Sequence, residues 1–193
     1  MDMISRTIMA IEGGRFSMGQ GVKCPVAFLV TEGIRPAKLF FMEVEVDGLD
    51  ATGTALEAIG ASGMRIDAIM AGSIPIAGFN VIDPQEIYRK TAIPSVFVLQ
   101  DRPDEGAVRR ALAKHFDDWE ARLRVIDGAG PLHEFKTPGG EGEGERVLIR
   151  CVGMGAEDAF RLVKSVTVFG RVPEPVRIAK MAAKALSDAL YAP

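Results

Sequence analysis

Four acidic residues stand where a carboxylate could do chemistry. Glu12 ends the apolar segment 6–11 and is followed by two glycines, which leave room for a ligand beside its carboxylate. Asp47 and Asp50 follow a later strand-like run, and Asp83 precedes a proline at the start of a helical pattern. Each also has a plainer structural role, since Glu12 could open an exposed turn, Asp47 could form a turn, and Asp50 and Asp83 could cap helices. The residue types alone leave both interpretations open.

The elements that must position these residues begin with three extended segments. Residues 6–11, 26–31 and 38–46 are strand-like, and the second half of the third segment alternates apolar with acidic residues. Such alternation indicates a strand with one buried and one wet face. Residues 32–37, EGIRPA, are rich in turn formers and join the second segment to the third. We therefore expect an antiparallel meander.

Helices and strands alternate in the rest of the chain. Helix-starting signals occur at Asp50, Asp83 and Asp104, and further helices are expected at 119–126, 158–165 and 176–190. Buried strands are expected at 65–71 and 95–99, and a hairpin is expected from 132–136 and 146–152. Because such crossovers are parallel and right-handed, the pattern predicts an α/β fold. It would have a ribonuclease-H-like mixed sheet, an antiparallel meander followed by parallel strands, with helices on both faces.

A doubly wound fold with a dinucleotide site is the competing architecture. It requires a glycine-rich turn directly between a first strand and a helix. The glycine-rich residues 12–21 lead instead into a strand-like segment. The order of elements therefore favours the ribonuclease-H-like sheet.

Length and composition narrow the class of protein. A chain of 193 residues suits one sizeable core, so we expect a single domain over residues 1–193. The net charge of −3 argues mildly against tight nonspecific binding to nucleic acid. Two cysteines and two histidines show no zinc spacing. No segment suits a membrane span and the N-terminus lacks the pattern of a signal peptide, so we expect a cytoplasmic protein.

Five sequence segments carry a resemblance to a known family. They are AIEGGRF at 10–16, VEVDGLDAT at 44–52, IAGFNVID at 76–83, WEARL at 119–123 and VPEPVRIA at 172–179. Together they resemble the endonuclease dU family, which is related to endonuclease V. The resemblance implies a ribonuclease-H-like fold. It also implies metal-dependent cleavage of DNA near deaminated bases, with deoxyuridine as the main substrate and deoxyinosine as a further one.

The resemblance also implies a metal site. Enzymes of this kind hold Mg²⁺ or Mn²⁺ through carboxylates at the ends of adjacent strands, and the ions activate water. On this basis we expect Glu12, Asp47 and Asp50 to be both catalytic and metal-binding. Asp83 is expected as a substitute metal ligand. Lys180 stands where the family often has a histidine and is expected to be catalytic.

Substrate contacts follow from the same match. Phe79 could stack on an extruded base, Asn80 could read its edge, and Arg177 could contact a phosphate. The plainer alternative is that Phe79 belongs to the core and Asn80 occupies a turn. The expected partner is therefore DNA that contains deaminated bases, and a homodimer remains undecided.

Three departures from the family pattern support a second hypothesis. Gly13 and Ala71 stand where the resemblance implies acidic residues, and Phe169 stands where a basic residue would suit a phosphate. An aspartate at Ala71 would be expected to share a metal with Glu12, whereas alanine has no ligand atom. The alternative is a catalytically impaired relative that serves as a nucleic-acid-binding or protein-interaction module.

Overall fold

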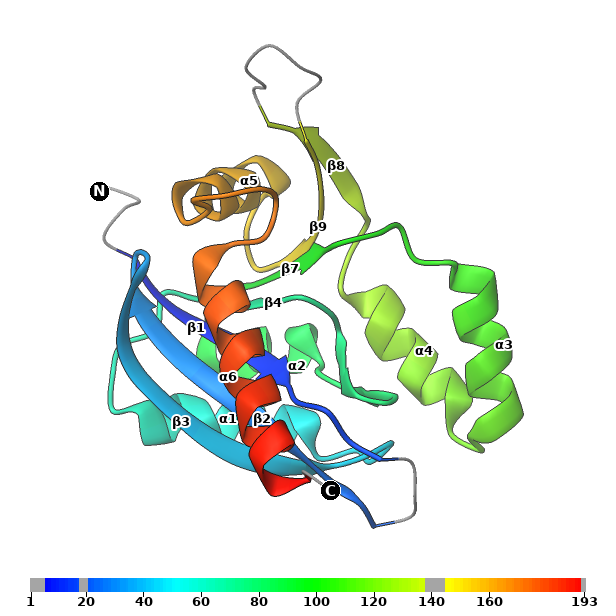
Figure 1. The fold of residues 1–193 in the computed structure, drawn as a ribbon. Coiled ribbons are helices and arrows are strands. Elements are labelled where there is room, and N and C mark those ends of the chain that lie inside the picture. Colours follow the sequence, from blue (N-terminus) through cyan, green and yellow to red (C-terminus); the bar gives the residue numbers. More distant parts are fainter. Residues whose placement is uncertain (1–5, 18–20, 138–144, 192–193) are drawn as a thin grey trace.

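The computed structural model describes residues 6–17, 21–137 and 145–191, and Figure 1 shows its fold. A seven-stranded mixed sheet runs in the order β3-β2-β1-β4-β7-β9-β8. Its strands are β1 (Thr7–Gly13), β2 (Lys23–Glu32), β3 (Arg35–Glu45), β4 (Ala68–Ala71), β7 (Ser95–Leu99), β8 (His133–Lys136) and β9 (Arg146–Val152).

The first three strands form the predicted antiparallel meander. β1 pairs antiparallel with β2, and β2 pairs antiparallel with β3. The turn between β2 and β3 is tighter than the sequence suggests, because Gly33 adopts a φ of 61° and β3 already begins at Arg35. β2 is buried along nearly its whole length, which explains why its sequence is apolar without alternation.

The parallel part of the sheet places three strand ends together. β4 pairs parallel with β1 and with β7, whereas β9 runs antiparallel to β7. β4 begins only at Ala68, three residues later than expected, and residues 65–67 lead into it without strand structure, although the Asp67 N–H already donates to the Thr7 carbonyl at 2.8 Å. The carboxyl ends of β1, β4 and β7 therefore lie at the same edge of the sheet.

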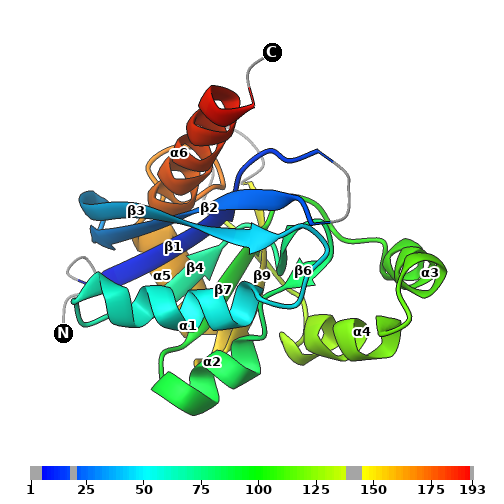
Figure 2. The ribbon, with the colours of Figure 1, turned by 90° about the horizontal axis from the view of Figure 1, so that it is seen from below.

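Helices cover both faces of the sheet, as predicted. In Figure 2, α6 (Glu174–Leu190) lies on one side of β1 and β2, and α1 (Ala51–Ser62) lies on the other. α2 (Pro84–Thr91) shares the α1 face, and α5 (Ala156–Ser165) packs on the face that α6 covers. α6 begins at Glu174, two residues before its predicted start, because proline fits the first turn of a helix.

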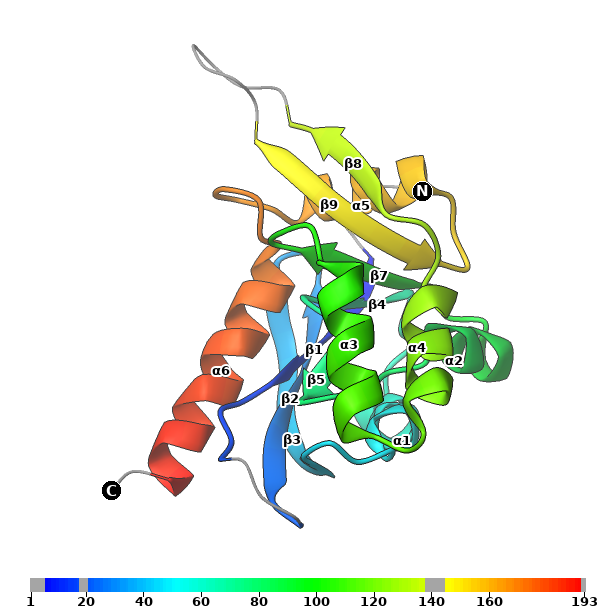
Figure 3. The ribbon, with the colours of Figure 1, turned by 90° about the vertical axis from the view of Figure 1, so that its right-hand side faces the viewer.

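A helical pair stands beside the sheet. Figure 3 shows α3 (Glu105–His115) and α4 (Trp119–Gly128) packed side by side. A two-stranded hairpin, β5 (Pro75–Ala77) with β6 (Asn80–Val81), was not expected from the turn-rich sequence. The tip between β8 and β9, residues 138–144, lies outside the described residues. Among the helices of the described chain, none has the length and apolar character needed to cross a membrane.

Candidate functional site

A pocket of about 220 Å³ opens at the carboxyl ends of β1, β4 and β7, beneath the start of α6. We call it the Glu12 pocket. It is lined by Glu12, Gly72, Ser73, Val98, Gln100, Val172, Val176 and Lys180. In open α/β sheets, sites form at the carboxyl ends of the strands, so this position favours a functional site.

Glu12 is the buried acid of this pocket. Glu12 is only 8% exposed, and its Oε1 accepts a hydrogen bond of 2.5 Å from the Gly72 backbone N–H. Burial raises the pKa of Glu12 to about 7, although the Gly72 hydrogen bond and the charge of Lys180 both pull the pKa down. A carboxyl with this pKa is half ionised near neutral pH and can exchange protons there.

The register of β1 and β4 corrects the expectation for Ala71. Ile11 pairs with Ala71, and successive side chains on a strand point to opposite faces. Ala71 therefore packs on the far side of the sheet, beside Phe97 and Ile74. Gly72 is the residue that faces Glu12, since a Cβ on Gly72 would lie 2.9 Å from Glu12 Oε1. The position that could hold a partner carboxylate is Gly72, and an aspartate at Ala71 could not share a metal with Glu12.

Gly13 has a steric reason to be glycine. A Cβ on Gly13 would lie 2.0 Å from the carbonyl oxygen of Ile76, which is too close for any side chain. β5 therefore passes directly against the end of β1. An acidic residue at Gly13 would require this backbone to move.

Asp47 organises the hairpin rather than the Glu12 pocket. It adopts a φ of 59°, and its Oδ1 accepts a hydrogen bond of 2.7 Å from the Phe79 N–H. The Asp47 N–H donates to the carbonyl of Ala77 at 3.0 Å. Asp47 thus holds the turn between β5 and β6 from both sides.

Asp50 and Asn80 form a second structural contact. The Asp50 carboxylate accepts from the Glu45 N–H at 3.1 Å and from Asn80 Nδ2 at 2.5 Å. Asn80 is fully buried, and its side chain also donates to the Glu45 carbonyl and accepts from the Ala51 N–H. The polar atoms of its side chain are thereby occupied within the protein, so Asn80 has a structural role, and we call this set of contacts the Asn80 latch. Asp50 stands at the start of α1 but makes no side-chain cap.

Asp83 caps α2. Its carboxylate accepts from the backbone N–H groups of Gln85 and Glu86, and its own N–H donates to Thr52 Oγ1 at 2.9 Å. Across residues 6–17, 21–137 and 145–191, no three His, Cys, Asp or Glu side chains gather closely enough to hold a metal ion. The four expected ligands are therefore not brought together. One buried carboxylate beside a lysine does not fit a site for two divalent cations.

The remaining predicted residues divide between the pocket and its surroundings. Lys180 lines the Glu12 pocket. Arg177, one turn earlier on α6, instead pairs with the buried carboxylate of Glu174, 3.0 Å from its Nε. Phe79 is half-buried and packs edge-on against Phe116 at 5.7 Å between ring centroids.

Sequence reasoning missed most of the pocket wall. Gly72, Ser73 and Gln100 follow strand ends, and Val172 precedes α6. A strand-end position is visible in the sequence, but the face it presents depends on the register with its neighbour. The sequence did indicate a site position at the end of β4, but the resemblance led to Ala71 and not to its neighbour Gly72.

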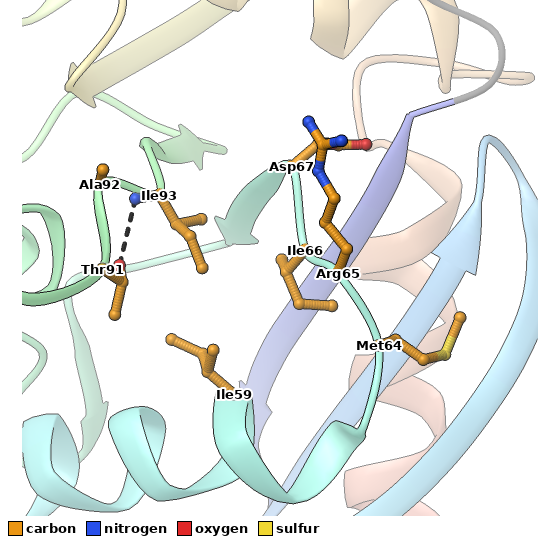
Figure 4. A pocket seen from close by; sticks show the side chains of 8 residues that line it. All are labelled: Ile59, Met64, Arg65, Ile66, Asp67, Thr91, Ala92 and Ile93. Atoms are coloured by element: carbon orange, nitrogen blue, oxygen red, sulfur yellow. Dashed lines mark hydrogen bonds and ion pairs between the residues drawn. The ribbon is translucent and has the colours of Figure 1, made fainter.

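A second hollow of about 430 Å³ lies at the opposite, amino end of β4 and β7. Figure 4 shows its wall, in which Ile59, Ile66 and Ile93 point inward between α1 and the start of β4. The Ile93 N–H donates to Thr91 Oγ1 at 3.1 Å within this wall. Arg65 and Asp67, 3.4 Å apart, are the charged residues of its lining. Neither of these two residues is a buried acid like Glu12, so the Glu12 pocket remains the better candidate.

Comparison with known proteins identifies the family. Residues 5–187 match the sequence model of the family described as Endonuclease dU. A UPF0215 protein of Pyrococcus furiosus is 35% identical over 145 residues, which cover 74% of this chain and 71% of that protein.

Solved structures agree with this assignment. A crystal structure of a protein of unknown function from Archaeoglobus fulgidus superposes with a TM-score of 0.77 at 29% identity, covering 94% of this chain and 98% of the other. Endonuclease V of Ciona intestinalis, solved with a 24mer DNA containing inosine, gives a TM-score of 0.61 at 10% identity, covering 96% of this chain and 87% of the other. The second likeness concerns the fold alone, and it confirms the predicted ribonuclease-H-like architecture. The chain therefore belongs to the endonuclease dU family and has an endonuclease V-like fold.

Proposed function

We propose that this protein is an endonuclease. It would use the Glu12 pocket to cleave DNA beside deaminated bases, deoxyuridine in particular. The observation that carries the proposal is the position of Glu12, a buried acid where β1 ends beside β4, in a member of the endonuclease dU family. Asp47, Asp50, Asn80 and Asp83 would support this site by fixing the loops around it.

The residues of the pocket suggest how cleavage would proceed. Glu12 would take the proton of a water molecule that attacks the phosphorus. This proton would then pass to the leaving nucleotide oxygen as its bond to phosphorus breaks. Lys180 would stabilise the negative charge on the phosphate. Because the donors do not fit two cations, we expect binding of Mg²⁺ or Mn²⁺ to be weak or absent.

A second candidate is a catalytically impaired relative that binds nucleic acid without cutting it. The observation that favours it is the lack of a side chain at Gly72, the residue that faces Glu12. A two-ion nuclease needs carboxylates on both neighbouring strands. In this case a carboxylate supplied at Gly72 would restore metal-dependent cleavage.

A cleavage assay tests both candidates. Labelled oligonucleotides with a single deoxyuridine or deoxyinosine, and matched undamaged strands, are incubated with Mg²⁺, with Mn²⁺ or with a chelator. The proteins are wild type, Glu12→Gln, Gly72→Asp and the exposed control Glu57→Gln. We expect cleavage beside deoxyuridine by wild type and the control, and a loss of about 100-fold or more in Glu12→Gln.

Each other outcome has a definite meaning. Equal cleavage by wild type and Glu12→Gln would show that Glu12 is not the reacting group. No cleavage by wild type, together with metal-dependent cleavage by Gly72→Asp, would establish that the protein is a catalytically impaired relative. No cleavage by any of the proteins, together with binding of the oligonucleotide, would indicate a nucleic-acid-binding module.

A further inference from the structure

The segment between α5 and α6 presents an exposed aromatic ring. Phe169 is 79% exposed, and its neighbour Val168 is 49% exposed. Single exposed apolar residues are common and need no explanation by themselves. Phe169 is informative because of what surrounds it.

The segment that carries Phe169 leads directly into the wall of the Glu12 pocket. Val172 and Val176, three and seven residues further along, both line that pocket. In Figure 1 the same segment runs from α5 to the start of α6. Phe169 therefore stands three residues before the first α6-side residue of the pocket wall.

A third, smaller hollow adjoins the Glu12 pocket. It has a volume of about 50 Å³ and shares Gln100 with the Glu12 pocket. We call it the Arg171 hollow, and its charged lining residues are Asp101, Arg102, Glu134, Arg146 and Arg171. Arg171 follows Phe169 by two residues, so the aromatic ring and the hollow lie on one segment.

The Arg171 hollow has more positive than negative charge. Its three guanidinium groups pair with two carboxylates, Arg102 and Arg146 with Glu134 at 2.9 and 3.5 Å, and Arg171 with Asp101 at 3.6 Å. These arginines are between 41% and 69% exposed in their side chains. Exposed ion pairs contribute little stability, so phosphate oxygens can replace the carboxylates at small cost.

We propose that the Arg171 hollow and Phe169 bind a single strand of nucleic acid that leaves the Glu12 pocket. Phe169 stacks on an unpaired base, and the three arginines hold the phosphates on either side. A single strand is the occupant because the bases of a duplex are already stacked on one another and offer no free face. This inference rests on the proposed action at the Glu12 pocket and names the form of the substrate there.

Tryptophan fluorescence tests the stacking directly. Phe169→Trp is placed in the Glu12→Gln background with a chelator, so that no strand is cut. The control is Ile34→Trp. Ile34 is exposed and lies in the turn after β2, at the end of β1 and β2 where Thr7 pairs with Glu32, which is opposite to the end that carries Glu12. A single-stranded 12-mer should quench Phe169→Trp and leave the control unchanged, and a duplex of the same sequence should quench less.

Binding affinities test the same contact without a new fluorophore. Phe169→Ala should weaken binding of the labelled 12-mer about tenfold by fluorescence anisotropy, as expected for one lost stacked base. Arg171→Ala should lower the slope of log affinity against log salt by about 0.7, the share of one phosphate contact on a single strand. The exposed control Lys164→Ala should change neither quantity.

The outcomes separate this inference from the proposed function. Cleavage that depends on Glu12, with no change of binding in Phe169→Ala, would overturn the inference alone. Binding that depends on Phe169, without cleavage by wild type, would support the inference and count against cleavage. Stronger binding to duplex than to single strand, or no binding to any oligonucleotide, would also overturn the inference.

Discussion

Glu12 has its unusual environment because the strand that carries it is buried on both faces. The segment from Ile8 to Ile11 is fully buried, and α6 covers the face to which Glu12 points. Within the described residues, the Gly72 N–H is the one hydrogen-bond donor to the Glu12 carboxylate. Burial therefore outweighs that bond and the charge of Lys180, and the pKa of Glu12 rises to about 7.

The raised pKa predicts a pH-dependent stability. Because the native state holds the Glu12 proton more tightly than the unfolded chain, the stabilising contribution is full below about pH 4.5 and is lost as pH rises through about 7. Glu12→Gln removes this term while keeping an acceptor for the Gly72 N–H. Urea unfolding at pH 5 and pH 8.5 should show wild type losing up to about 3 kcal/mol more than Glu12→Gln over that interval. The same pH dependence in both proteins would contradict the assignment.

The loop elements around the site are held by polar side chains that the sequence suggested as ligands. Asp47 fixes the β5–β6 hairpin, and Asn80 joins that hairpin to the start of α1 and the end of β3. A buried amide with all its hydrogen bonds made contributes specificity to the loop arrangement. These contacts give the polar residues of both loops a structural role that requires no metal.

Removing the Asn80 latch should destabilise the protein. Asn80→Ala leaves the buried Ala51 N–H without its partner and removes one of the two donors to the Glu45 carbonyl, the other being the Gly48 N–H, at a cost of about 2–3 kcal/mol. The matched control is Gln85→Ala, an exposed amide with one hydrogen bond to the Gly128 carbonyl. Urea unfolding should show a loss below about 1 kcal/mol for this control. Equal losses in the two variants would refute the latch.

At the scale of the molecule, Arg122 connects the α3–α4 pair to the loops of the sheet. It is 5% exposed and donates to the carbonyls of Gly48 and Phe79 at 2.9 and 2.7 Å. It also pairs with Asp118 at 2.8 Å and stacks over the Phe116 ring at 4.4 Å. One side chain therefore links the helical pair to both loops that Asp47 and Asp50 organise.

Replacing Arg122 should loosen this connection. Arg122→Met keeps an unbranched apolar stem but removes every donor, and we expect a loss of about 2–3 kcal/mol in the free energy of unfolding. Hydrogen exchange should become faster in α3, in α4 and in residues 47–50 and 78–80, with little change in β1 and β2. Arg124→Met, an exposed neighbour on the same helix, is the control. Unchanged protection of α3 and α4 would show that other contacts hold the pair.

Local patterns in the sequence determined the order and type of the elements. Alternation and apolar runs predicted β1, β2 and β3, and Asp83 before Pro84 predicted the start of α2, because strand burial and helix capping depend on nearby residues. Five sequence segments also led to the family through their resemblance to it. The small β5–β6 hairpin escaped prediction because its pairing is short and is fixed by Asp47 from another loop.

Only the tertiary structure decided which polar residues form the site. Ala71 and Gly72 are adjacent in sequence, yet the parallel register with β1 turns one toward Phe97 and the other toward Glu12. Asp47, Asp50 and Asp83 look like ligands in the sequence, but backbone N–H groups from distant or neighbouring segments occupy their carboxylates. A sequence shows which residues can bind a ligand, whereas strand register and long-range hydrogen bonds decide which of them remain available to one.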